Sequence, residues 1–244
     1  MRNGSVGLLA GQVVLVLGGS SGIGLETARH ARAEGAELIL TGRDPVRLTG
    51  AGRELDAKTV AFDALDFARL GEFFDELSPV DHVMVSGGGP YYAPLAEFDF
   101  EKGREDLDAH LWLQVHVARH ALTKVRPGGS LLFISGTGGR RTDVGFTLIS
   151  ALTAAMPALA RNLAFEIAPI RVNVIAAGFV DTPLSASLLG DDIEKRREQL
   201  RATLPIGRVV GPDDIASLAI HLMTNTAVTG ATYDIDGGQQ LVKA

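Results

Sequence analysis

Residues 13–36 read VVLVLGGSSGIGLETARHARAEGA, an apolar run followed by closely spaced glycines and then an amphipathic stretch. The apolar run is typical of a buried β-strand, and the periodicity after it predicts a helix. Gly18, Gly22 and Gly24 lie where the two meet. Glycines permit a tight turn and a close backbone approach, so that free N–H groups and the positive helix end can meet a pyrophosphate. We therefore favour a dinucleotide-binding turn over an ordinary structural turn, which the same glycines could also make.

The alternation of strand and helix continues along the chain. Further β-like runs read ELILTG, KTVAFD, HVMVSG, SLLFISG, RVNVIAAG and ATYDIDGG. The segments between them predict helices over residues 24–33, 67–77, 101–124, 150–168, 191–202 and 212–223. Strands separated by helices imply a parallel sheet. We predict one α/β domain over residues 1–244, Rossmann-like and doubly wound, with a mostly parallel sheet and a ligand at the carboxyl ends of its strands.

Composition excludes several classes of function. The net charge is −6 and no run rich in lysine or arginine occurs, so we expect no nucleic-acid partner. The chain has no cysteine, which excludes disulfides, thiolate nucleophiles and cysteine-bound metals and suits a reducing cytoplasm. The N-terminal segment reads as a first strand and not as a signal peptide. We find no apolar run of roughly 18 residues, and we expect a soluble, cytoplasmic protein without a membrane partner.

The end of the second strand, LILTGRD, bears on the choice of dinucleotide. A site for NAD needs a carboxylate near this point to bind the ribose 2′-OH, and Thr41 and Gly42 supply none. Arg43 suits a 2′-phosphate instead. Asp44 follows directly and weakens the argument, and Arg43 could simply be a solvated loop charge. The pattern favours NADP(H) over NAD(H).

Four motifs together resemble the short-chain dehydrogenase/reductase family over nearly the whole chain. They are GGSSGIG at 18–24, FDALD at 62–66, IRVNVIAAGFVDT at 170–182 and YDIDGG at 233–238. The resemblance implies that one loop faces the adenine, a second lines the ribose and a third holds the nicotinamide amide. The cofactor-binding residues expected beside Arg43 are Gly18, Ser20, Ser21, Gly22, Ile23 and Gly24, then Asp63 and Ala64, then Ser86, Gly87 and Gly88, and finally Gly178, Val180 and Thr182.

The catalytic residues that the resemblance implies are missing. The family uses a Tyr-x-x-x-Lys pair, a serine and an asparagine, and the tyrosine protonates the carbonyl oxygen. In the family's register these positions hold Ile149, Thr153, Gly136 and His110, and no Tyr-x-x-x-Lys occurs anywhere. Loss of a positioned general acid typically costs about 10² to 10⁴ in rate. Ordinary carbonyl reduction is therefore expected to be very slow unless another group substitutes.

Two side chains are candidates for that substitution. His110 occupies the asparagine position and carries an imidazole, a common general acid or base, although the position also has a structural role in the family. Asp143 lies in the loop before residues 146–161, where a substrate would meet the nicotinamide, although it could equally belong to a solvated loop. His116 and His120 are four residues apart and could bind metal, but a helix-surface reading is favoured and we assign no metal site.

Three functions remain open at this point. The first is an NADP(H)-dependent oxidoreductase with a non-standard active site that acts on an unidentified carbonyl or alcohol. The second is an isomerase or cyclase that uses the bound cofactor without hydride transfer, and the third is a cofactor sensor or scaffold. The resemblance implies a mobile lid over residues 183–204 and tetramers formed through two apolar helices, so we also expect a small-molecule substrate and a homo-oligomer, either a tetramer or a dimer.

Overall fold

The computed structural model describes residues 7–242, and the ends of the predicted 1–244 domain, residues 1–6 and 243–244, lie outside the described residues. Within this range one sheet has seven strands in the order β3-β2-β1-β4-β5-β6-β7, and every neighbouring pair is parallel. The α/β prediction is therefore confirmed. The strands are β1 (Val13–Leu17), β2 (Glu37–Gly42), β3 (Lys58–Ala61), β4 (Val80–Val85), β5 (Val125–Gly136), β6 (Arg171–Ala177) and β7 (Thr232–Ile235).

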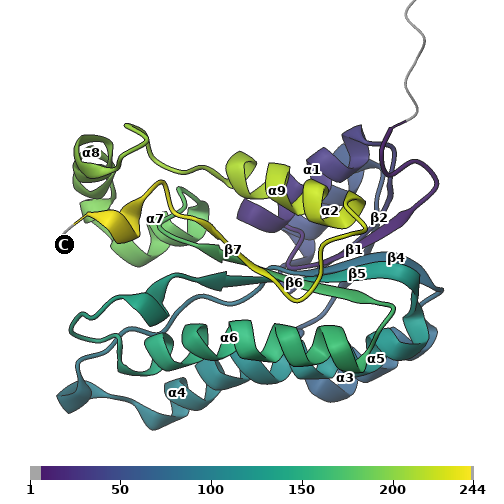
Figure 1. Ribbon diagram of the computed structural model, residues 1–244, viewed down its shortest axis with the longest axis horizontal. Helices are drawn as coiled ribbons and strands as arrows, with labels where there is room; N and C mark the ends of the chain where they lie inside the picture. The colour runs from purple at the N-terminus through teal and green to yellow at the C-terminus, as the bar shows by residue number, and fades with distance from the viewer. Residues whose placement is uncertain (1–6, 243–244) are drawn as a thin grey trace, which may run out of the picture.

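Helices cover both faces of the sheet (Figure 1). Helices α1 (Gly22–Ala33), α2 (Pro45–Leu55) and α9 (Pro212–Thr224) lie on one face, and α3 (Phe67–Glu76), α4 (Phe100–Leu107), α5 (Leu113–Lys124) and α6 (Thr147–Glu166) lie on the other. Two apolar cores result, one on each side of the sheet. The carboxyl ends of the strands face α7 (Pro183–Leu189) and α8 (Ile193–Thr203), at the left of Figure 1.

Aspartate caps explain where several helices begin. Asp44, Asp66 and Asp99 accept backbone N–H groups at the starts of α2, α3 and α4. The sequence prediction missed α2, because its segment PVRLTGAGREL contains two glycines that lower its helix propensity. It also missed α7, a short helix with Pro183 in its first turn and the Thr182 side chain as its cap.

The helix expected over residues 101–124 is interrupted. The chain runs through α4, then a π-helical turn at Asp108–Trp112, and then α5. Single π turns inside helices occur frequently at functional sites. This turn carries His110, one of the two candidate catalytic residues.

The expectation that the chain has no apolar run long enough to span a membrane is wrong for α6. By length and composition it could cross a membrane, with a mean hydropathy of 1.3 over an 18-residue window. The same properties belong to the core helix of a globular domain, and Met156 and Ala160 of α6 pack in the core below the sheet. Helix α6 is therefore long and apolar enough to span a membrane, but in this structure it packs against β5 and β6.

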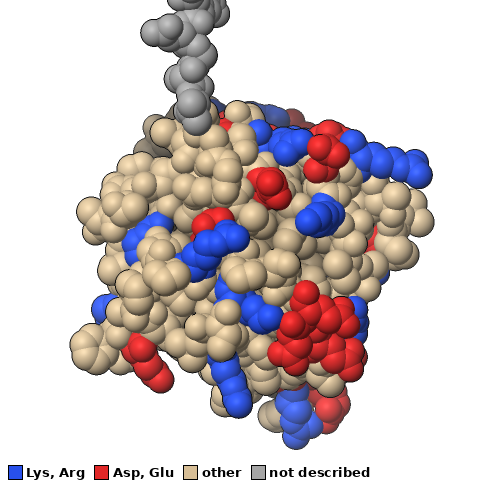
Figure 2. All heavy atoms as spheres, turned by 90° about the vertical axis from the view of Figure 1, so that its right-hand side faces the viewer, with Lys and Arg blue, Asp and Glu red and all other residues tan. Residues whose placement is uncertain are grey.

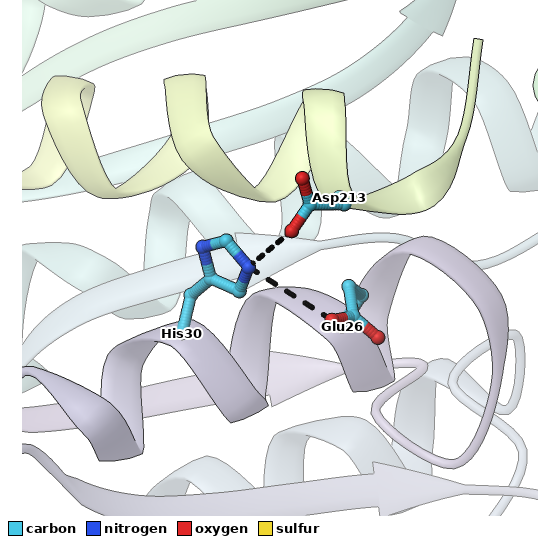
Figure 3. Close-up of side chains that lie close together, drawn as sticks. All are labelled: Glu26, His30 and Asp213. Atoms are coloured by element: carbon cyan, nitrogen blue, oxygen red, sulfur yellow. Dashed lines mark hydrogen bonds and ion pairs between the residues drawn. The ribbon is translucent and has the colours of Figure 1, made fainter.

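Helices α1 and α9 are joined by a small polar cluster (Figure 3). The His30 Nε2 lies 2.7 Å from an oxygen of Asp213 and 3.8 Å from an oxygen of Glu26. The ligand atoms of these residues lie within 4.8 Å of one another, close enough to hold a metal ion. The second oxygen of Glu26 is paired with Arg29 at 2.8 Å. An ion pair across the two helices accounts for the contacts that are present.

The opposite edge of the sheet carries the amino ends of the strands. Figure 2 shows this side of the molecule, where basic and acidic side chains are interspersed. Arg126 pairs with Asp81 at 2.6 Å and Arg32 pairs with Asp56 at 2.7 Å.

Candidate active site

The turn between β1 and α1 accepts only glycine at two positions. A Cβ on Gly18 would lie 2.6 Å from the carbonyl oxygen of Ser86, and one on Gly24 would lie 2.2 Å from the carbonyl oxygen of Gly18. Gly18 also has a φ of 88°, which favours glycine. The backbone of the turn therefore packs directly against the end of β4 and leaves no room for a side chain at Gly18.

Helix α1 begins without a side-chain cap among the described residues, and its first turn contains no acidic residue. Its first N–H groups are therefore available to an anion, and the helix dipole favours negative charge at that point. Ser20, Ser21 and Ile23 lie in this turn. This arrangement fits the pyrophosphate of a dinucleotide.

The loop after β6 faces the turn. A Cβ on Gly22 would lie 3.6 Å from the side chain of Thr182. Thr182 caps α7, and the loop that contains Val180 runs between Gly178 and this cap. A Cβ on Gly178 would come within 2.7 Å of the Gln239 side chain. The expected phosphate and nicotinamide segments therefore lie across from each other at the carboxyl ends of β1 and β6.

Gln239 is a residue that the sequence analysis missed. Its side-chain oxygen accepts the backbone N–H of Phe179 at 2.9 Å, 60 residues away in sequence. The side chain is buried, so the bond stabilises the backbone of the loop after β6. No local pattern could have indicated a partner so distant in sequence.

Asp44, at the end of β2, has a structural role of its own. Its Oδ1 accepts the backbone N–H groups of Val46 and Arg47 at 2.9 and 3.1 Å and caps α2. Arg43 is exposed beside it. The Ser20 hydroxyl lies 3.0 Å from the position of a Cβ on Gly42, the residue before Arg43. A guanidinium and a hydroxyl at this point fit a 2′-phosphate.

The remaining expected cofactor residues follow β3 and β4. Asp63 is exposed and accepts the N–H of Leu65 at 3.1 Å, beside Ala64. Ser86, at the end of β4, donates its backbone N–H to Leu17 at 2.9 Å. A Cβ on Gly87 would meet nothing within 4 Å in the described structure, so there is open space above this residue. Such space at the end of a parallel strand is where a dinucleotide is bound in this class of fold.

His110 lies under the same loop. Gly88 has a φ of 91°, and a Cβ on it would lie 3.2 Å from Ala109 and 3.9 Å from Cε1 of His110. The His110 Nδ1 lies 2.9 Å from Oδ1 of Asp106, whose side chain is 1% exposed. Asp106 was not singled out in the sequence, although its spacing of four residues from His110 in a predicted helix was visible.

Asp143 lies elsewhere and makes only a local contact. It is exposed, and its carboxylate accepts the N–H of Val144 at 2.8 Å. No hydrogen bond joins it to His110 within residues 7–242. The structure thus brings His110, but not Asp143, against the glycine loop after β4.

Helix α6 carries packing residues at the positions where the resemblance implies a catalytic tyrosine and lysine. Ile149 and Thr153 are 4% and 6% exposed, and the Thr153 hydroxyl donates to the backbone oxygen of Ile149 at 2.8 Å. A cavity of about 250 Å³ lies beneath this part of α6. It is lined by Ser135, Gly136, Gly139, Arg140, Thr153, Ala154, Met156, Pro157, Val174, Ala176 and Thr232. The buried Ser135 hydroxyl has no hydrogen-bond partner among the described residues.

The histidine pair on α5 packs against α3. His116 stacks on Phe67 with ring centroids 4.0 Å apart, and His120 stacks on Phe74 at 4.9 Å. Burial lowers the pKa of His120. These contacts account for both rings as packing groups between the helices.

The fold and the glycine turn are typical of dinucleotide-binding α/β proteins, and comparison with known proteins gives the family of this chain. A family model described as enoyl-(acyl carrier protein) reductase matches residues 18–240. The short-chain dehydrogenase/reductase ATR9 of Stachybotrys chlorohalonatus is 28% identical over 255 residues, covering 94% of this chain and 97% of that protein. The chain belongs to the short-chain dehydrogenase/reductase family of oxidoreductases.

Two solved structures extend the comparison. The MalC reductase/Diels-Alderase from Malbranchea aurantiaca has a TM-score of 0.89 and 26% identity, with 98% of this chain and 100% of that chain covered. BdcA in complex with NADPH has a TM-score of 0.86 and 26% identity, with 95% of each chain covered. NADPH complexes therefore occur among the structural neighbours of this fold.

Proposed function

We propose that the protein is an NADP(H)-dependent oxidoreductase that acts on a small carbonyl or alcohol substrate through a non-standard active site. The observation that carries the proposal is the uncapped start of α1 behind a glycine turn, facing Thr182 across the carboxyl edge of the sheet. The NADPH complex of BdcA supports the choice of cofactor.

Different segments of the chain bind different parts of the dinucleotide. The turn at Gly18–Gly24 receives the pyrophosphate, Arg43 and Ser20 receive the 2′-phosphate, and the loop at Gly178–Thr182 receives the nicotinamide amide. Asp63 and Ala64 border the adenine, and Ser86, Gly87 and Gly88 border the ribose. When bound, the reduced cofactor supplies a hydride to the substrate carbon.

His110 is the proton donor that this geometry favours. It lies against Gly88, in the loop that is expected to border the ribose, and a buried carboxylate orients its ring. A general acid must be within hydrogen-bond reach of the reacting oxygen. Asp143 remains a second candidate that would need its loop to move toward the site.

A non-redox enzyme is the alternative that the neighbours favour most. MalC is named as both a reductase and a Diels-Alderase, so one chain of this fold combines reduction with a pericyclic reaction. Ile149 and Thr153 offer no proton to a substrate in the way that the family's tyrosine does. A cyclase or isomerase that uses the dinucleotide as a charged surface would also tolerate their loss, as would a cofactor sensor or scaffold.

Calorimetric titration with NADPH and, separately, NADH tests the cofactor. We expect NADPH to bind at least tenfold more tightly, since a charge-assisted contact to the 2′-phosphate contributes about 1.5 to 3 kcal/mol. If neither binds, the glycine turn is structural and the proposal fails.

Hydride transfer is tested with stereospecifically deuterated NADPH and a panel of ketones, enones and imines. Deuterium in the product identifies a reductase. Turnover of a substrate that requires NADPH but gains no deuterium identifies the cyclase or isomerase alternative. Binding without any turnover favours the sensor or scaffold.

Subunit assembly is part of the same proposal. Trp112 and Phe165 are 46% and 89% exposed on the outer side of the helical layer formed by α3 to α6, and apolar surface of this kind favours contact with a second copy. We propose a homo-oligomer in the cytoplasm. Light scattering on a size-exclusion column measures its mass, and a monomer would contradict the assignment.

A further inference from the structure

Asp106 is a buried carboxylate on α4 whose contacts converge on the active site. Its Oδ1 lies 2.9 Å from the His110 Nδ1 and accepts the backbone N–H of Tyr91 at 3.3 Å. Its Oδ2 has no hydrogen-bond partner within residues 7–242. An ionised carboxylate in such a place is costly unless a neighbouring charge compensates it. The His110 ring is the group positioned to do so.

The contacts also fix the tautomer of His110. Nδ1 lies 2.9 Å from the Asp106 carboxylate and 3.1 Å from the Asp106 backbone oxygen. A carbonyl oxygen can only accept a hydrogen bond, and so can an ionised carboxylate. Nδ1 must therefore carry a hydrogen. Nε2 makes no hydrogen bond in the described chain, and the adjoining Cε1 lies against Gly88, so the free nitrogen is on the side of the ring near the glycine loop after β4.

We propose that Asp106 is the positioning residue for His110. It holds the ring with Nδ1 protonated and balances the charge of the imidazolium, so that the Nε2–H can protonate a bound substrate. This inference rests on the proposed reduction. No position of the standard catalytic pair supplies the function, since Ile149 and Thr153 occupy both.

The proton step balances as follows in the direction of reduction. The carbonyl carbon accepts the hydride, and the electrons of the C=O π bond move to the oxygen. That oxygen forms a bond to the proton of Nε2 while the N–H bond breaks. His110 is left as a neutral ring with Nδ1 still protonated, and one proton taken up from solution per turnover restores Nε2–H.

Two other ionisable side chains act on this corner from neighbouring loops. Tyr92, in the loop after β4, interacts electrostatically with Asp106, and Arg141, in the loop before α6, interacts with Tyr92. The Tyr92 ring also packs on Phe146 with centroids 5.0 Å apart. A Tyr92→Phe variant keeps that packing and removes the phenol, so it separates a tyrosine donor from a histidine donor.

The tautomer can be measured directly, without substrate or cofactor. Long-range ¹H–¹⁵N spectra of the full chain labelled in histidine distinguish Nδ1–H from Nε2–H at alkaline pH. The chain has six histidines, and His110→Asn identifies the signals of interest. We expect an Nδ1–H ring in the unmodified protein. An Nε2–H ring would overturn the proposal.

Asp106→Asn then tests the role of the carboxylate. The amide keeps the shape of Asp106 but can donate to Nδ1, so we expect the His110 signal to move toward Nε2–H. Glu105→Gln removes the same charge one residue away on an exposed side chain and should leave the signal unchanged. An unchanged tautomer in Asp106→Asn, or the same change in Glu105→Gln, would contradict a positioning role.

Turnover provides a second and separable readout. With a substrate identified by deuterium transfer, Asp106→Asn should lower kcat by about 10- to 1,000-fold and leave KM within about twofold, because positioning acts on the chemical step. A rise in KM alone would argue against positioning. If no hydride reaches any product while Asp106 still fixes the tautomer, the proposed reaction fails and the assignment of the pair stands.

Discussion

Buried polar groups near the amino ends of the strands differ from those near the carboxyl ends in how many hydrogen-bond partners they have. At the amino ends of β4 to β6 the polar groups bond to one another. The buried His82 ring contacts Ser130 at 2.8 Å and Gln12 at 2.6 Å. Arg171 donates from its two terminal nitrogens to four backbone carbonyls near the end of α9, although its Nε has no partner within the described chain. These bonds stabilise the fold.

At the carboxyl ends, several polar groups lie in packed surroundings but have no hydrogen-bond partner among the described residues. Helix α1 is uncapped and the Ser135 hydroxyl is without a partner within the described chain, as is one oxygen of Asp106. Open space lies above Gly87. Free groups in rigid surroundings lower stability and provide binding. Substitutions at the two ends should therefore affect different properties. Those at the amino ends should lower the stability of the fold, and those at the carboxyl ends should lower the affinity for NADPH.

The largest effect is expected for Arg171→Met, at an amino end. The change removes the donor of two buried bonds, to the backbone oxygens of Leu222 and Met223, and weakens the bonding of two partly buried carbonyls, so we expect the free energy of unfolding to fall by about 3 kcal/mol or more. Urea denaturation measures it. NADPH affinity of the molecules that remain folded should not change.

Arg126→Met is the matched control at the same edge. Its partner Asp81 forms an exposed ion pair, which contributes about 0 to 1 kcal/mol. If Arg171→Met cost no more than this control, the amino ends would not be the stabilising edge.

Gly87→Val tests the opposite end and should lower NADPH affinity by about 10- to 100-fold, equal to about 1.4 to 2.7 kcal/mol. Its side chain would enter the open space above β4 and should leave the free energy of unfolding nearly unchanged. Calorimetry and urea denaturation on the same sample measure both. Gly50→Ala, at another position with nothing nearby, should leave affinity unaltered. Equal affinity of Gly87→Val would place the ribose elsewhere.

Low pH should lower the free energy of unfolding through protonation of His82, which lies near the amino end of β4. Burial, assisted by the charge of Arg171 and opposed by Asp81, lowers the pKa of His82 from 6.5 to about 4. The folded state resists protonation, so the stabilisation is fully present above pH 6.5 and is lost as the pH falls toward 4. We expect a loss of about 2 kcal/mol between pH 7 and pH 5.

His82→Gln provides the comparison for this pH dependence. The variant has no titrating ring, so the difference in unfolding free energy between pH 7 and pH 5 should shrink by about that amount. Unfolding curves at the two pH values measure it. An unchanged pH dependence would assign the acid sensitivity to other groups.

The smallest effect is expected for Arg43→Leu, which should weaken NADPH binding by about tenfold, or about 1.4 kcal/mol, and leave NADH binding unchanged. Arg47→Leu removes an equal charge nearby, but Arg47 pairs with Asp44 at 3.2 Å and should matter to neither cofactor. Equal losses for NADPH and NADH in Arg43→Leu would refute a contact to the 2′-phosphate.

Prediction from sequence succeeded where the signal is local. The β1–α1 turn was readable because strand, glycines and helix are consecutive, and the shared direction of the strands followed from helices between them. It failed at α2, where glycines lower propensity and the Asp44 cap restores the helix. It also treated Asp44 as a rival of Arg43, because a cap can be assigned only when the start of the helix is known.

The parallel α/β fold, the glycine turn and the absence of a Tyr-x-x-x-Lys pair could all be read from the sequence, since each is a pattern of neighbouring residues or of composition. Only the tertiary structure decided that Asp106 is buried and faces His110, that Gln239 holds Phe179, and that Asp143 makes only a local contact. The physical reason is that burial and pairing depend on how the helices and loops pack around the sheet. Residues far apart in sequence create the environment that gives a polar side chain its role.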